Sequence, residues 1–163
     1  TLIMIRLTGE FRWEMCKRIQ GGRWNDVSER SLTSEYFDYI QFYRKNQELS
    51  PDAKDKIRTD MGRAKNSFKE MFIMDYILWV LYESNGAPRL NKVARNIMLT
   101  YCTFPLNIRE KLKANPMYRE LLEKYDFHME QKRHRMDNLC QKLAASGKRI
   151  PEEIEREKQF LYL

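Results

Sequence analysis

Between residues 118 and 143, apolar side chains recur at alternating steps of four and three residues. This spacing places them along one side of a helix, as in helices that pack lengthwise against another helix. The pattern predicts one long heptad-patterned helix around 116–145, which starts at the proline after Asn115 and stops before Gly147. The members of this seam are Tyr118, Leu122, Tyr125, Met129, Lys132, Met136, Leu139 and Leu143.

Lys132 is the one charged residue in the seam. In a coiled coil, a charge at such a position lowers stability and fixes the register or the number of helices. In a monomeric bundle, the lysine stem packs along the seam while the ammonium group reaches solvent. The second arrangement is the one that the sequence favours.

A second segment, around 68–84, is apolar on nearly every side, because Asp75 is the one charged residue between Met71 and Tyr82. A helix that is apolar all round is buried all round, so this segment is predicted to be a buried central helix. Asp75 then needs a polar partner from another helix, or it binds a proton. A structural carboxylate is the favoured interpretation, and a perturbed acid at a functional site is the alternative.

Start and stop signals divide the rest of the chain into further helices. One helix is expected from Thr8 to Gln20, with Phe11, Met15 and Ile19 on one side. Other expected starts are Thr33, Ser50-Pro51, a capping box at Ser67 to Glu70, Pro88, Phe104-Pro105 and Ile150-Pro151, the last opening a helix through Leu161. No stretch alternates strictly between apolar and polar residues. The predicted class is therefore all-α, a single-domain bundle of seven or eight helices.

The composition of 163 residues, 42% of them hydrophobic, is enough for one ordinary domain, predicted to cover 1–163. Residue 1 is threonine, so either an initiator methionine has been removed or the chain is a piece of a longer protein, which we favour. Three distant cysteines without a CxxC pair indicate a reducing compartment, and a cytoplasmic location is expected. No apolar run approaches the ~20 residues that a membrane span needs.

The common catalytic signatures are missing: the sequence has no HExxH, ExxH, GxSxG or phosphate-binding glycine loop. His128 and His134 are six residues apart on the long helix, so they point about 120° away from each other and do not share a metal on it. We therefore expect no catalytic residue, no metal, no cofactor and no enzymatic activity.

The net charge of +7 is spread along the chain and interleaved with acids. Two basic clusters nevertheless stand out. Arg89, Lys92 and Arg95 recur at three-residue steps on one predicted helical face, and Lys132, Arg133 and Arg135 form the densest positive run. Both clusters could contact phosphates. The favoured interpretation is that they are solvated faces of amphipathic helices with acids within reach.

The sequence thus predicts a non-catalytic helical module that binds another protein, or other domains of a parent protein, or that scaffolds an assembly. The long helix, the abundance of methionine and aromatic residues and the missing catalytic motifs favour this function. A nucleic-acid-binding helical protein that uses its basic faces is the alternative. Binding measured at two salt concentrations distinguishes them, because contacts to phosphate weaken steeply with salt.

Overall fold

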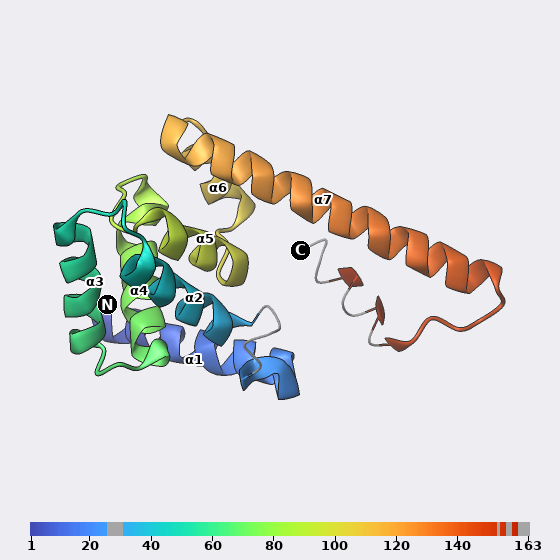
Figure 1. The fold of residues 1–163 in the computed structure, drawn as a ribbon. Helices are drawn as coiled ribbons and strands as arrows, with labels where there is room; N and C mark the ends of the chain where they lie inside the picture. Colours follow the sequence, from blue (N-terminus) through green and yellow to red (C-terminus); the bar gives the residue numbers. More distant parts are fainter. Residues whose placement is uncertain (26–30, 153, 156–157, 160–163) are drawn as a thin grey trace. The chain divides into compact units, whose positions relative to one another are not determined.

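A computed structural model of the chain describes residues 1–25, 31–152, 154–155 and 158–159. All regular secondary structure in these residues is helical, with seven α-helices and two short 3₁₀ helices (Figure 1), which confirms the all-α class. The chain divides into two compact units, residues 1–112 and 113–163, and each is described by itself. A single domain over residues 1–163 stays a prediction.

The first unit contains most of the helices. They are α1 (Leu2–Gln20), the 3₁₀ helix η1 (Gly21–Asn25), α2 (Leu32–Lys45), α3 (Pro51–Arg63), α4 (Phe68–Leu81), the 3₁₀ helix η2 (Glu83–Asn85), α5 (Lys92–Tyr101) and α6 (Leu106–Lys113), whose last residue begins the second unit. The second unit is built on α7 (Pro116–Ala145).

The predicted buried helix around 68–84 is present as α4 followed by η2, and α4 lies at the centre of the first unit. It packs against α1, α2 and α5. The ring of Phe72 contacts those of Trp13 on α1 and Tyr36 on α2, with centroids 5.5 and 6.4 Å apart. The buried side chains of α4 are Met71, Phe72, Ile73, Tyr76 and Trp79. Their burial on several sides explains why this segment shows no polar face.

The prediction for the first helix is wrong at its start, because α1 begins at Leu2 rather than at Thr8. The hydroxyl of Thr8 lies inside the helix and donates to the carbonyl oxygen of Met4 at 2.8 Å. The buried residues of α1 are Gly9 and Trp13. The side that carries Phe11, Met15 and Ile19 is exposed instead.

The break expected before Ser67 separates α3 from α4. Lys65 and Asn66 turn the chain in the left-handed region, with φ of 50° and 56°. The Ser67 hydroxyl accepts the amide N–H of Glu70 at 3.4 Å, which is half of the predicted capping box. The Glu70 carboxylate is occupied elsewhere, because it accepts two hydrogen bonds from the Arg6 guanidinium of α1 at 3.1 and 2.8 Å.

The helix expected from Pro88 begins later, after Asn91, whose side chain caps α5. The residues between η2 and α5 are held by a buried carboxylate instead. Glu83 accepts the backbone N–H groups of Arg89 and Leu90 at 2.6 and 2.7 Å. Amides that bond to a side chain in this way do not need a helical turn to be satisfied.

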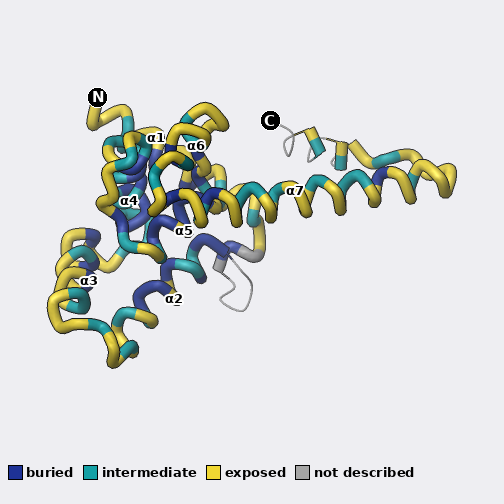
Figure 2. The backbone as a smooth tube through the Cα atoms, turned by 90° about the horizontal axis from the view of Figure 1, so that it is seen from above, coloured by how far each residue is buried: buried dark blue, intermediate teal, exposed yellow. Residues whose placement is uncertain are grey.

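In the second unit, α7 matches the predicted helix 116–145, and the Asn115 side chain caps it. Tyr118 and Leu122 are buried, whereas most later members of the seam are only half-buried and Lys132 is exposed. Figure 2 shows mostly exposed and intermediate residues along this helix. The exposed Lys132 agrees with an ammonium group that reaches solvent.

The segment after α7 is linked to it by an ion pair between Lys158 and Asp137 at 2.8 Å. The helix predicted from Pro151 to Leu161 falls partly outside the described residues. Its first turn is present, because the N–H groups of Ile154 and Glu155 donate to the Pro151 carbonyl. Compared with the thickness of a bilayer, each described helix is too short or too polar to cross it.

Candidate interaction surface

The outward side of α1 carries a row of large apolar side chains, one at every fourth residue. Their exposed fractions range from 37% to 77%. Residues four apart form the ridge by which one helix packs into the groove of another. Over sixteen residues this ridge is about 24 Å long and turns through about 160°, so Leu7, Phe11 and Met15 form its centre and Ile3 and Ile19 lie at its two edges. The α1 row consists of Ile3, Leu7, Phe11, Met15 and Ile19.

The opposite side of α1 is fixed on the core. A Cβ atom on Gly9 would lie 3.0 Å from Cδ1 of Tyr76, so the α1 backbone approaches α4 very closely. Trp13 packs edge-on against Trp24 with ring centroids 4.8 Å apart. Gly9 and Phe11 are two residues apart and therefore point about 160° away from each other. The contact that buries Gly9 thus turns the α1 row towards solvent.

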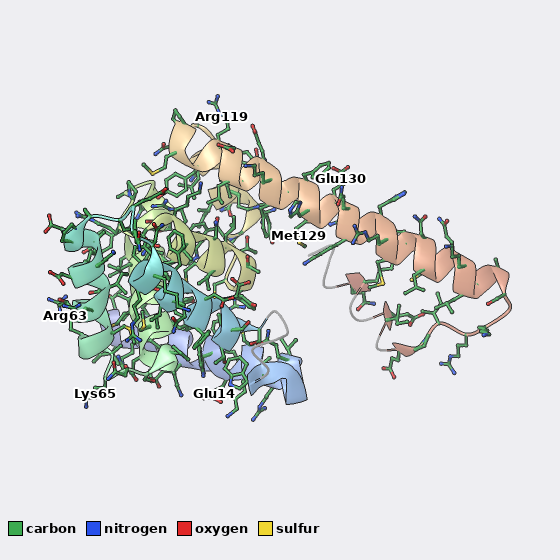
Figure 3. The ribbon with its side chains drawn as sticks, viewed as in Figure 1. Glu14, Arg63, Lys65, Arg119, Met129 and Glu130 are labelled. Carbon is green, nitrogen blue, oxygen red and sulfur yellow. The ribbon has the colours of Figure 1, made fainter. Side chains whose placement is uncertain are left out.

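Both acidic residues of α1 are engaged in ion pairs. Glu10 pairs with Arg6 at 3.3 Å, and Arg6 also bonds to Glu70 of α4 at 2.8 Å, which raises the pKa of Arg6. Glu14, labelled in Figure 3, pairs with Lys69 of α4 at 2.9 Å, and this bond lowers the pKa of Glu14. These pairs link α1 to α4 and neutralise the acids beside the row.

Apart from Arg6, the basic residues of α1 are not engaged in such pairs. Arg12, Lys17 and Arg18 form no ion pair with any residue that the structure describes. Because the acids of α1 are paired, the rim of the α1 row is positively charged. An apolar ridge with a positive rim is complementary to an apolar surface with acidic residues beside it.

The first basic cluster needs a correction, because Arg95 is not available to a phosphate. Arg95 is buried, and its Nε and Nη2 donate to the carboxylate of Glu83 at 2.6 and 3.1 Å. Arg89 precedes α5, and its guanidinium lies 5.4 Å from the centre of the Tyr82 ring. Lys92 is exposed at the first turn of α5. The three residues therefore do not share one helical face.

The second basic cluster lies on α7. Lys132 and Arg135 are exposed, and their separation of three residues puts them on one side of the helix. Arg133 is half-buried and points to a different side. In the part of the chain that the structure describes, no group of three His, Cys, Asp or Glu side chains is arranged to hold a metal ion.

Asp75 has a partner outside its own helix, as its apolar neighbours require. The hydroxyl of Tyr36 on α2 donates to Oδ2 of Asp75 at 2.9 Å. Burial raises the pKa of Asp75 to about 7, although the bond from Tyr36 opposes the shift. Nearby, the Asp60 carboxylate raises this pKa and the Lys56 ammonium lowers it. Asp75 therefore links α2 to α4 and changes its charge near neutral pH.

Replacing Asp75 with asparagine is expected to flatten the dependence of stability on pH. The folded-state pKa is about 7 against an ordinary value of 3.8, so the folded protein retains a proton that the unfolded chain loses. Stability from this group is therefore complete below about pH 4 and is lost as the pH rises to about 7. From pH 4 to 8, Asp75→Asn should gain about 1–3 kcal/mol relative to the unmodified protein. Urea unfolding across this range measures the difference, and parallel curves would contradict the assignment.

The fold and this surface define an all-α protein whose first helix is apolar on two opposite sides. Residues 21–160 match the model of a family described as a domain of unknown function, DUF8509, and the chain belongs to that family. No curated protein and no solved structure matches the chain. The matched region begins directly after α1, so the α1 row lies outside it.

Proposed function

We propose that this protein is a non-catalytic helical interaction module and that the α1 row binds its protein partner. The observation that carries the proposal is the exposure of five large apolar side chains on one ridge of α1. Contiguous apolar patches on a protein surface mark interaction sites, because their exposure to water is unfavourable. A ridge of this regularity suits a partner that presents a groove of the same spacing.

The partner that fits best is an amphipathic α-helix with acidic residues beside its apolar side. An α-helix offers grooves that match a ridge of every fourth residue. The cations Lys17 and Arg18 attract negative charge to the rim of the row, and the acids of α1 are already paired. A second copy of the chain would bring the same positive rim and is less favourable.

The proposal also concerns nucleic-acid binding and the location of the protein. Nucleic-acid binding is less favoured, because Arg95 is bonded to Glu83 and the remaining cations of its cluster lie on different segments. A cytoplasmic location accords with the free thiols of Cys16, Cys102 and Cys140, which a reducing compartment preserves.

A designed peptide tests the surface directly. The probe is a helical peptide of about 20 residues with leucines at helical spacing and flanking glutamates. A comparison peptide has the same leucines but carries lysines in place of the glutamates. Fluorescence anisotropy should show binding of the acidic peptide and at least tenfold weaker binding of the basic one. Phe11→Glu should weaken binding of the acidic peptide at least tenfold. Phe127→Glu is the matched control, because Phe127 is a similarly exposed phenylalanine on α7.

Three results would contradict the proposal. The first is equal binding of the two peptides, and the second is unchanged binding by Phe11→Glu. The third is that a second copy of the chain or a membrane covers the α1 row. Sedimentation equilibrium would then show self-association, or the protein would co-pellet with anionic vesicles, and Phe11→Glu would abolish the effect. Duplex DNA that binds the unmodified protein at micromolar concentration and 150 mM salt would favour the nucleic-acid alternative.

A further inference from the structure

The first unit contains a cavity of about 260 Å³ that is distinct from the α1 row. It is lined by α4 and η2, by the connection from α5 to α6, by the first turn of α6 and by one residue of α1. Its apolar wall includes Trp79, Val80, Phe104 and Ile108, and its polar side includes Arg12 and Tyr76. An apolar cavity with a few convergent polar groups is the usual form of a small-molecule site.

The wall of the cavity is held in place by interactions that leave little freedom. The Trp79 and Phe104 rings are stacked with centroids 3.9 Å apart and an interplanar angle of 7°. Trp79 Nε1 donates to the Cys102 carbonyl at 2.8 Å, and Arg109 donates to the Phe104 carbonyl at 2.8 Å. The first bond fixes the α5–α6 connection to α4, and the second fixes it to α6. A wall that is already formed loses little entropy when it binds a ligand.

The polar side of the cavity is positive. Arg12 lines this side of the cavity together with Tyr76, and no described carboxylate pairs with Arg12. Burial raises the pKa of the Cys102 thiol to about 12, so this neighbour is neutral. The guanidinium has five N–H donors in a planar fork, so it can bond to both oxygens of a ligand carboxylate.

We propose that this cavity binds a small amphiphilic monocarboxylate. The carboxylate bonds to Arg12, and the apolar body of the ligand packs against Trp79, Phe104 and Ile108. An apolar cavity of about 150 Å³ is large enough for benzene, so one of about 260 Å³ holds roughly ten non-hydrogen atoms. A carboxylic acid of about eight carbon atoms has that size. The ion pair at one end sets the orientation of the ligand and selects against neutral molecules.

Octanoate is the probe, and isothermal titration calorimetry on the full chain is the measurement. A ligand of ten non-hydrogen atoms is expected to bind with a dissociation constant on the order of 1 mM. 1-Octanol, which has the same body without the charge, should bind at least tenfold more weakly. Arg12→Gln should weaken octanoate at least tenfold, whereas Val80→Trp should fill the cavity and abolish octanoate binding.

Two control variants test whether the loss of octanoate binding is specific to Arg12. Arg63→Gln removes the same charge from an exposed position on α3 (Figure 3) and should not change octanoate binding. Phe11→Glu changes the α1 row and should also bind octanoate normally, so the two proposals can fail separately. The inference is overturned if octanol binds as tightly as octanoate, if Arg12→Gln binds octanoate normally, or if no heat of binding appears up to about 10 mM. Circular dichroism melts show that each variant is folded.

Discussion

Replacing Arg95 with methionine is expected to lower the free energy of unfolding by about 3–5 kcal/mol. Glu83 is completely buried, and Arg95 supplies its cation through Nε at 2.6 Å. Methionine fills much of the same volume but removes the guanidinium from the buried carboxylate, to which the backbone N–H groups of Arg89 and Leu90 still donate. A buried charge that has lost its partner is strongly destabilising. Urea unfolding followed by circular dichroism measures the loss.

Two further variants separate the ion pair from simple packing. Arg95→Lys keeps the charge but loses the paired hydrogen bonds, so it should fall between the unmodified protein and Arg95→Met. Adding Glu83→Gln to Arg95→Met removes the stranded charge, so the double variant should be less destabilised than the sum of the single ones. If Arg95→Met changes stability by less than about 1 kcal/mol, the pair does not hold the η2–α5 connection as described.

Gly9→Val is expected to destabilise the protein by about 2–3 kcal/mol, because it overpacks the contact between α1 and α4. A Cβ atom at this position already meets the buried Tyr76 ring at 3.0 Å, and the two γ-methyl groups of valine have no space. Gly62→Val on α3 is the matched control, because a Cβ there meets no atom within 4 Å. Thermal unfolding compares the two variants. Equal melting temperatures would show that the close approach at Gly9 is absent.

Much of the fold follows from local signals in the sequence. Asn115 with Pro116 fixes the start of α7, Ser50 with Pro51 fixes the start of α3, and Ser67 fixes the start of α4. Each of these signals acts within one helical turn, so neighbouring residues are sufficient to read it. The apolar circumference of α4 predicts its central position for a similar reason, because total burial leaves no need for a polar side.

The orientation of α1 could not be predicted in the same way. Apolar residues lie on two opposite sides of this helix, and hydrophobicity alone does not say which side packs on the core. Gly9 was the available clue, since a glycine inside a helix often permits a close approach of two backbones. Its meaning depends on Tyr76, which lies far away in the sequence and reaches Gly9 only in the folded chain.

The buried ion pair and the cavity could not be predicted from the sequence for a related reason. Glu83 and Arg95 are twelve residues apart, on either side of an irregular connection, so no helical spacing links them. The steps of three from Arg89 to Arg95 instead predicted one charged face, which the late start of α5 removes. The cavity combines Arg12 with residues of α4 and the α5–α6 connection. Such sites arise from packing and leave no motif in the sequence.

The two apolar sides of α1 also affect how the chain behaves during synthesis. α1 is made before the helix that covers its inner side, and 61 residues separate the end of α1 from the end of α4. At typical rates of about 5–20 residues per second, the ribosome needs roughly 3–12 s to add them. During this interval both sides of α1 are uncovered, which makes the nascent chain prone to aggregation. A partner or chaperone that binds the Phe11 side early would therefore protect the chain before α4 folds against the Gly9 side.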